Sequence, residues 1–267
     1  MKRKQTAHVL SQREIAPDIY DMWIETSLAA QARPGQFLGV YPKDRSTLLP
    51  RPISICEVNA GVEAADVAGG SVDLAEGSAV RPGGVNALRI VYRIAGAGTR
   101  EFSAYRTGET VELLGPLGNG FPMFPKETTE KGAGKKVFLI GGGIGIPPIL
   151  ELAKQLEADK AEKQIILGYR DSAQFLKEDF ERYGTVCVAT EDGSAGTKGN
   201  VMDAIRENSL EADIIYACGP MPMLRAVKKY AAERQIPAWI SLEEHMACGV
   251  GACLGCVVKT KEIDHHS

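Results

Sequence analysis

Three of the six cysteines fall within nine residues of one another, in the order Cys248, Cys253 and Cys256. Their C-x4-C-x2-C spacing is typical of plant-type [2Fe-2S] sites, in which the thiolates bind iron. Glycines at positions 249, 251 and 255 would let the loop turn its N–H groups toward the sulfurs. A zinc site is the alternative, although zinc sites more usually pair two C-x2-4-C knuckles from distant positions. The spacing therefore predicts an iron–sulfur site on these three cysteines.

Such a cluster needs four ligands, but no cysteine follows Cys256 in the last eleven residues. We expect the fourth cysteine slightly beyond position 267, in the natural protein or its relatives. His265 or His266 is an alternative, because histidine replaces cysteine in Rieske centres. Cys187 and Cys218 are poor candidates, since both lie in predicted strands away from the cysteine-rich tail.

A glycine-rich turn lies between a predicted buried strand at residues 137–140 and a predicted helix at residues 147–158. Its glycines are Gly141, Gly142, Gly143 and Gly145. Glycines let the backbone approach a pyrophosphate, and the helix N-terminus supplies free N–H groups. Ile146 replaces the last glycine of the G-x-G-x-x-G fingerprint, so a turn that serves only packing is the alternative.

Two further turns follow strands of the same predicted sheet, at residues 190–194 and 218–222. Ligands of open α/β sheets gather at the carboxyl ends of the strands, so three such turns favour a nucleotide. Glu191 or Asp192 could accept a hydrogen bond from a ribose 2′-OH and would repel a 2′-phosphate. These carboxylates therefore favour NADH over NADPH.

The first half of the chain carries groups that could hold a flavin. Arg51 and Ser54 lie on one predicted strand, Arg93 ends another, and Gly98 and Thr99 follow it. An arginine and a helix start led by threonine would give a flavin pyrophosphate cationic donors and free N–H groups. Taken singly, the same residues fit an ordinary strand arginine and an N-cap threonine.

The elements that must position these residues change in character along the chain. Residues 1–126 show short alternating segments separated by Gly and Pro, which predicts an antiparallel β-barrel with an insertion at about residues 57–86. Residues 135–240 alternate strands with helices, which predicts a doubly wound parallel sheet. Residues 241–267 form a small lobe with the cysteines. The predicted fold class is a β barrel plus α/β.

Composition limits the possible partners. The chain has 44% hydrophobic and 24% charged residues and a net charge of -3, so it lacks the basic footprint of a nucleic-acid-binding protein. No apolar run has the length of a signal peptide or a membrane span. Clustered thiols favour a reducing compartment. We expect a cytoplasmic protein without a nucleic-acid or membrane partner.

Together the motifs resemble the ferredoxin–NADP reductase superfamily in order and spacing. They are Arg51–Ser54, Gly98–Thr99, Gly115–Gly118, Gly141–Gly145 and Cys218–Pro222. The resemblance implies a flavin-binding barrel and a pyridine-nucleotide domain, with the flavin and the nicotinamide meeting between them. It implies that FAD lies against Arg51, Pro52, Ile53, Ser54, Val91, Tyr92, Arg93, Gly98 and Thr99. It implies a pyridine nucleotide against Gly141, Gly142, Gly143, Gly145, Asp192, Cys218, Gly219 and Pro220.

The lobe entered through residues 241–256 more closely resembles the electron-transfer subunits of type B dihydroorotate dehydrogenases. That resemblance implies an oxidoreductase with FAD, a [2Fe-2S] cluster and NAD(H). It also implies an FMN-containing partner subunit that oxidises dihydroorotate in pyrimidine biosynthesis, in a heterotetramer with two copies of each subunit. Electrons would pass from FMN through the cluster to FAD and NAD+, with no catalytic acid or base from this chain.

Two alternatives remain open. One is the FAD and [2Fe-2S] subunit of a sulfide dehydrogenase or of a ferredoxin:NADP oxidoreductase complex, which shares the same modules. The other is a non-catalytic interaction module stabilised by zinc, which would bind neither flavin nor NADH.

Overall fold

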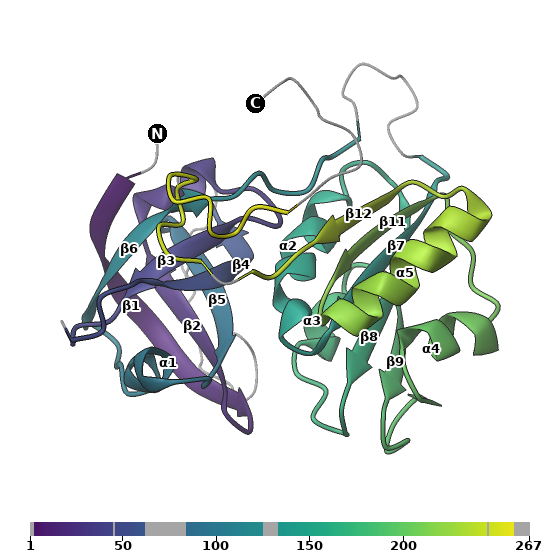
Figure 1. Cartoon of the computed structure of the whole chain (residues 1–267), viewed down its shortest axis with the longest axis horizontal. Helices are drawn as coiled ribbons and strands as arrows, with labels where there is room; N and C mark the ends of the chain where they lie inside the picture. Colours follow the sequence, from purple (N-terminus) through teal and green to yellow (C-terminus); the bar gives the residue numbers. More distant parts are fainter. Residues whose placement is uncertain (1–2, 45, 62–83, 125–132, 245, 259–267) are drawn as a thin grey trace, which may run out of the picture.

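The computed structural model describes residues 3–44, 46–61, 84–124, 133–244 and 246–258. A β-barrel and an α/β domain lie side by side, and the segment after the last strand runs back from the α/β domain to the barrel (Figure 1). The predicted fold class, a β barrel plus α/β, is confirmed. None of the helices in the described part of the chain combines the length and the apolarity that a membrane crossing requires.

The barrel is closed by six strands in the order β1-β2-β5-β4-β3-β6, with antiparallel neighbours. Its strands are β1 (Arg3–Ala16), β2 (Ile19–Glu25), β3 (Phe37–Tyr41), β4 (Arg51–Asn59), β5 (Ala87–Arg93) and β6 (Thr110–Leu117). Successive side chains of a strand point to opposite faces, so the alternation in the sequence fills the barrel with apolar groups. A 3-10 helix, η1 (Ser27–Gln31), follows β2, and a short helix, α1 (Ala97–Phe102), follows β5.

The stretch predicted as an insertion, at about residues 57–86, overlaps the end of a barrel strand. Residues 57–59 continue β4, where they pair with residues 87–89 of β5. Residues 62–83 lie outside the described part of the chain.

The α/β domain contains a parallel sheet in the order β10-β9-β8-β7-β11-β12. Its strands are β7 (Lys136–Gly142), β8 (Glu162–Tyr169), β9 (Thr185–Thr190), β10 (Thr197–Lys198), β11 (Ile214–Cys218) and β12 (Ala238–Ser241). Its helices are η2 (Gly143–Gly145), α2 (Pro147–Gln155), α3 (Lys177–Glu181), α4 (Val201–Glu207) and α5 (Met221–Arg234). The strand order reverses between β7 and β11, which opens a crevice at the carboxyl ends of the strands.

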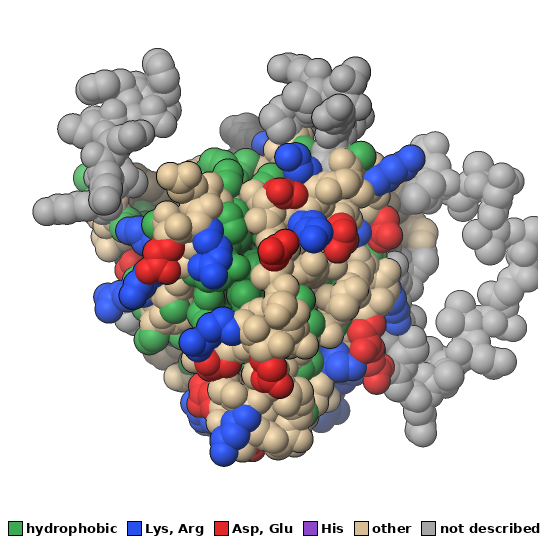
Figure 2. All heavy atoms as spheres, turned by 90° about the vertical axis from the view of Figure 1, so that its right-hand side faces the viewer, with side chains coloured by type: hydrophobic (Ala, Val, Ile, Leu, Met, Phe, Trp, Pro, Cys, Tyr) green, Lys and Arg blue, Asp and Glu red, His purple; other side chains and the backbone are tan. Residues whose placement is uncertain are grey.

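Helices cover both faces of this sheet, as a doubly wound fold requires. Side chains of α2 and α3 belong to one apolar core, and those of α4 and α5 belong to another. The helix expected at residues 174–183 is shorter, because Leu176 at its N-cap adopts a left-handed backbone with φ of 65°. Basic and acidic side chains are interspersed over the outer face of this domain (Figure 2), in keeping with the small net charge.

The two domains share an apolar core. Ile19, Cys56 and Val91 of the barrel pack in one cluster with residues of β7 and α2. Across the same boundary, the hydroxyl of Tyr216 on β11 donates a hydrogen bond to the carbonyl of Pro122 at 2.9 Å. This shared core holds the crevice of the sheet against the barrel.

Candidate functional site

Two cavities adjoin between the domains. One, of about 870 Å³, lies between the barrel and the end of β12, and the other, of about 670 Å³, lies over the carboxyl ends of the parallel strands. Three residues line both cavities: Arg93, Ile144 and Glu243. Ligands in the two cavities would therefore meet at these three side chains.

The larger cavity brings together most of the residues expected at the flavin. Those that line it are Arg51, Pro52, Ile53, Ser54, Val91, Tyr92, Arg93 and Thr99. They converge because β4 and β5 are neighbours in the barrel and α1 begins shortly after β5. Gly98 lies beneath Arg51: a Cβ at Gly98 would be 2.7 Å from Nε of Arg51. Only a glycine lets the guanidinium lie against the start of α1.

The start of α1 differs from the expectation of a threonine-led helix. The N-cap is Gly96, and the hydroxyl of Thr99 accepts hydrogen bonds from the N–H groups of Ala95 and Gly96 at 2.8 and 3.2 Å. Thr99 therefore holds the turn together from inside the helix. The arginine is fixed from the other side, since Nη1 of Arg51 donates to the carbonyl of Leu49 at 2.5 Å.

Tyr92 supports the cavity wall from within the barrel. Its side chain is buried, its ring stacks on Tyr20 with centroids 5.9 Å apart, and its hydroxyl donates to Gln12 at 3.0 Å. Burial raises the pKa of Tyr92, so the phenol stays protonated. Its neighbours Val91 and Arg93 point to the opposite side of β5, toward the α/β domain.

The second cavity contains most of the residues expected at a pyridine nucleotide. Those that line it are Gly142, Gly143, Gly145, Gly219 and Pro220, while Gly141 lies within β7 and Cys218 lines the larger cavity. A Cβ at Gly145 would lie 2.5 Å from the carbonyl oxygen of Cys218 and from Cα of Gly219. The glycine is therefore required where the turns after β7 and β11 touch.

The two carboxylates of the turn after β9 have different surroundings. Glu191 lines the second cavity, together with Arg170 and Asp171, whereas Asp192 does not. The carboxylate of Asp192 accepts a hydrogen bond from the N–H of Ser194 at 2.9 Å, and hydrogen bonds from Ser194 lower its pKa. Of the two carboxylates, only that of Glu191 therefore faces the second cavity.

Glu243, which our reading of the sequence missed, lies where the cavities meet. Glu243 remains exposed to solvent, but partial desolvation beside the cavity walls raises its pKa, and the nearby Arg93 opposes that shift. The thiol of Cys218 is buried, which raises its pKa to about 12, and the charge of Glu243 adds to the shift, so the thiol is neutral at physiological pH. A signal for Glu243 was present, because it follows the carboxyl end of a predicted strand, as ligand-binding residues of such sheets do.

The segment with Cys248, Cys253 and Cys256, which we call the cysteine loop, lies against the barrel (Figure 1). A Cβ at Gly249 would be 3.2 Å from Cδ1 of Leu117 in β6. The sulfur of Cys248 accepts hydrogen bonds from the N–H groups of Cys253 and Val250, both at 3.4 Å, and these bonds lower its pKa to about 6. Stabilised thiolate and inward N–H groups suit a cluster ligand.

Among the described residues, no three side chains of His, Cys, Asp or Glu lie close enough together to hold a metal ion, and this includes Cys248, Cys253 and Cys256. The donor chemistry still fits iron, since the loop offers the thiols of Cys248, Cys253 and Cys256. His265 and His266, the alternative fourth ligands, lie outside the described residues.

Comparison with known proteins agrees with this arrangement. The family model described as "Oxidoreductase NAD-binding domain" matches residues 139–229. The model described as "Iron-sulfur cluster binding domain of dihydroorotate dehydrogenase B" matches residues 243–266. Among solved structures, that of an NADH-dependent reduced ferredoxin-NADP oxidoreductase is 29% identical, with a TM-score of 0.74, over 94% of this chain and 80% of that chain. A ferredoxin reductase in carbazole 1,9a-dioxygenase is 20% identical, with a TM-score of 0.66, over 90% and 69%, and shows the shared fold.

Two curated relatives carry the same name. The "Dihydroorotate dehydrogenase B (NAD(+)), electron transfer subunit" of Streptococcus mutans is 41% identical over 259 residues, which cover 97% of this chain and 89% of that protein. The protein of the same name from Bacillus caldolyticus is 41% identical over 252 residues, covering 93% and 86%. The resemblance inferred from the motifs is thus confirmed: the chain belongs to the family of dihydroorotate dehydrogenase B electron transfer subunits.

Proposed function

We propose that this chain is the NAD(H)-facing subunit of a dihydroorotate dehydrogenase. In this proposal it holds FAD in the larger cavity, NAD(H) in the second cavity and a [2Fe-2S] cluster on Cys248, Cys253 and Cys256. It passes electrons from an FMN-containing, dihydroorotate-oxidising partner to NAD+ in pyrimidine biosynthesis. Family membership and the NAD-binding and iron–sulfur family models support this assignment.

One observation carries the proposal: the two cavities adjoin, and the larger one reaches the start of the cysteine-containing segment. The cavities share Arg93, Ile144 and Glu243, and Met246, two residues before Cys248, lines the larger one. When bound, the flavin exchanges electron pairs with nicotinamide and single electrons with the cluster. An order of cluster, flavin and nucleotide along this path is the order that such a relay needs.

In this proposal the side chains of this chain bind and orient the flavin and the nucleotide. Arg51 supplies a guanidinium for the flavin pyrophosphate, and Glu191 accepts from the ribose hydroxyls of NAD(H). Cys218, held neutral by burial, adds a small uncharged group beside the junction. The proposed transfer requires no general acid or base from the described residues.

The partner would dock near the cysteine loop. Leu254 and Val257 of this loop are 70% and 68% exposed, an unusual exposure for large apolar side chains beside a redox centre. We propose an assembly with two copies of each subunit, located in the cytoplasm, where clustered thiols stay reduced.

Co-purification from the source cell tests this function. The expected result is an FMN-containing partner and a complex that reduces NAD+ when dihydroorotate is added. Purification with a different redox partner, together with no dihydroorotate-dependent NAD+ reduction, would refute it.

A second candidate is a subunit of a ferredoxin:NADP oxidoreductase complex, favoured by the solved structure that is 29% identical over 94% of this chain. It predicts a large iron–sulfur flavoprotein as the partner and activity with reduced ferredoxin. The partner's identity and the electron donor distinguish the two functions in the same purification.

A further inference from the structure

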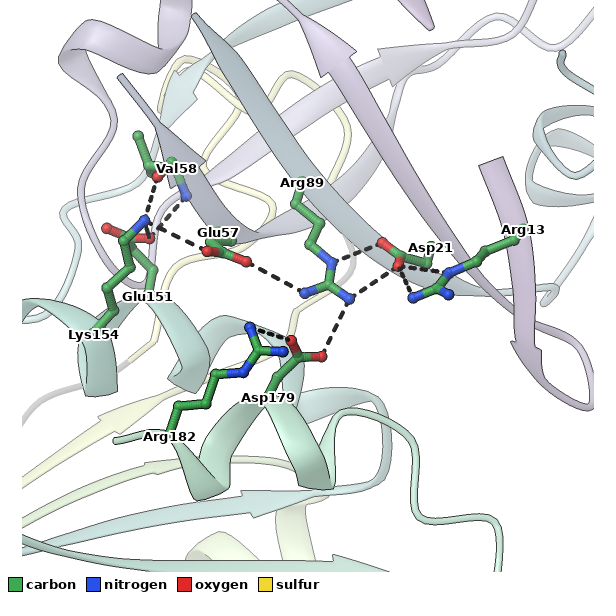
Figure 3. A network of polar contacts seen from close by, with 9 residues as sticks. All are labelled: Arg13, Asp21, Glu57, Val58, Arg89, Glu151, Lys154, Asp179 and Arg182. Atoms are coloured by element: carbon green, nitrogen blue, oxygen red, sulfur yellow. Dashed lines mark hydrogen bonds and ion pairs between the residues drawn. The ribbon is translucent and has the colours of Figure 1, made fainter. Parts of the chain in front are cut away.

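A chain of buried ion pairs crosses the boundary between the barrel and the α/β domain (Figure 3). Its centre is Arg89 of β5, which is 1% exposed. Nε and Nη2 of Arg89 donate to the two carboxylate oxygens of Asp21 on β2, at 2.8 and 2.9 Å. The same guanidinium donates to Glu57 of β4 at 3.3 Å and to Asp179 of α3 at 3.4 Å. Arg89 therefore joins two barrel strands besides its own to a helix of the other domain.

The network continues from Glu57 to α2. Nζ of Lys154 lies 3.5 Å from Oε1 of Glu57 and donates to the carbonyl of Val58 at 2.6 Å. The N–H of Val58 donates to Glu151, one turn earlier on the helix, at 2.8 Å. Helix α2 thus binds both backbone groups of Val58, and the contacts run unbroken from β2 to α2 and α3 (Figure 3).

The charges of the network balance. Its cations are Arg13, Arg89, Lys154 and Arg182, and its carboxylates are Asp21, Glu57, Glu151 and Asp179. A buried charge that loses its partner is costly, so such a network favours one arrangement of the two domains. Apolar packing at the same boundary is non-directional, so it specifies the relative rotation of the domains less sharply than these ion pairs do.

The elements that the network joins are those that carry the two cavities. Arg89 and Arg93 point to the same side of β5, because they are four residues apart on one strand, and Arg93 lines both cavities. Helix α2 directly follows the glycine turn. Helix α3 follows Asp171 and Phe175, which line the second cavity. A shift of the network would therefore change the gap at which the cavities meet.

We propose that Arg89 is a positioning residue that sets the distance between the ligands of the two cavities. By tying Asp21 and Glu57 to Asp179, it fixes the rotation of the α/β domain against the barrel. The inference rests on the proposed function only in assigning a flavin and a nicotinamide to the cavities. Arg89 acts through β5 and α3, and it contacts neither ligand.

Asp179→Asn tests the positioning role, because it weakens the contact of Arg89 with the α/β domain. The ion pairs of Arg89 with Asp21 and Glu57 within the barrel remain. Glu181→Gln is the matched control: it lies on the same helix, removes the same charge and loses only an exposed pair with Lys177. The assay is stopped-flow reduction, by NADH, of the flavin in the full chain purified with its FAD. A misplacement of about 1 Å can cost on the order of 100-fold in rate, so we expect a limiting rate at least about tenfold lower in Asp179→Asn.

The apparent Kd for NADH and the FAD content should stay within about twofold of wild type, because the contacts within each cavity are intact. Glu181→Gln should behave as wild type, and Asp179→Glu should restore the rate. A lower melting temperature with an unchanged limiting rate would reduce the network to a structural role and overturn the proposal. If Asp179→Asn does not fold, Lys154→Met removes the ion pairs at the α2 end of the network. It should likewise lower the limiting rate of flavin reduction while the apparent Kd for NADH stays unchanged.

Hydrogen exchange at the amide of Val58 gives a readout that needs neither FAD nor NADH. Because Glu57 couples the two ends of the network, Asp179→Asn should raise exchange at this amide by about fivefold or more, and Glu181→Gln should not. Unchanged exchange in Asp179→Asn would overturn the proposal. If NADH fails to reduce the flavin of the wild-type chain, the proposed function is refuted, but the hydrogen-exchange result still tests the positioning role of Arg89.

Discussion

Replacing Gly98 by alanine tests whether Arg51 and the start of α1 hold the flavin pyrophosphate. An alanine Cβ at this position would lie 2.7 Å from Nε and 3.1 Å from Cζ of Arg51. The guanidinium is the flexible end of its side chain, so it can move away, but it then no longer lies against the helix start. Gly96, the N-cap of the same helix, gives the matched control, because a Cβ there would meet nothing within 4 Å.

The expected size of the effect follows from the contact that is lost. A hydrogen bond to a charged group contributes about 1.5–3 kcal/mol, so moving Arg51 should raise the Kd for FAD by about 10- to 150-fold. Alanine within a helix is favoured over glycine by roughly 0.5–1 kcal/mol, so the melting temperature of the Gly98→Ala chain without FAD should not fall. A loss of affinity without a loss of stability would therefore place the effect at the site.

The assay is a fluorescence titration of the FAD-free chain with FAD, next to a thermal melt of the same samples. Gly96→Ala should bind FAD within about threefold of wild type, since its methyl group enters open space. If Gly98→Ala binds FAD as tightly as Gly96→Ala does, Arg51 does not hold the pyrophosphate from this position, and the assignment of the larger cavity loses its main support.

Three further predictions concern the choice of nucleotide, the cluster ligands and the domain boundary. Glu191→Gln should raise kcat/KM for NADPH by about tenfold, because it removes a like-charge repulsion with the 2′-phosphate; an unchanged ratio of NADPH to NADH turnover would contradict this. Cys253→Ser should abolish the iron, the sulfide and the EPR signal of the cluster while FAD stays bound; wild-type iron content would exclude Cys253 as a ligand. Burial raises the pKa of Tyr216 to about 12 from about 10, so the stability that this phenol contributes is present below about pH 10 and is lost as the pH rises toward 12. The loss would be at most roughly 2–3 kcal/mol in the free energy of unfolding. In denaturant titrations between about pH 10 and 12, this free energy should fall less steeply for Tyr216→Phe than for wild type, and an equally steep fall would contradict the prediction.

The sequence allowed the architecture to be predicted because its signals are local. Alternating apolar residues and glycine or proline turns mark barrel strands, and the repeated strand-helix pattern marks a parallel sheet. Boundaries were less accurate where backbone geometry decides them. Leu176, in a left-handed conformation, delays the start of α3, and Gly96 rather than a threonine is the N-cap of α1.

The candidate site was harder to predict because it is assembled from distant segments. Glu191 and Asp192 are adjacent in sequence and equal in charge, and only the structure shows that Glu191 lines the second cavity while Asp192 accepts a hydrogen bond from Ser194. Glu243 can be recognised as a site residue only in the structure, where it lies just after β12 and lines both cavities.

The ion-pair network could not be found from sequence patterns. Asp21, Glu57, Arg89 and Asp179 come from four elements across both domains and share no motif. Buried charges are recognised only when their partners are known, because a charge in a strand is otherwise expected to face solvent.

An anaerobic reduction experiment on the purified chain, with its cofactors bound, tests the proposed electron path. NADH should bleach the flavin absorbance of the chain alone, and dihydroorotate should do so only after the FMN-containing catalytic subunit is added. Bleaching by dihydroorotate without that subunit, or no bleaching by NADH, would refute the proposed function.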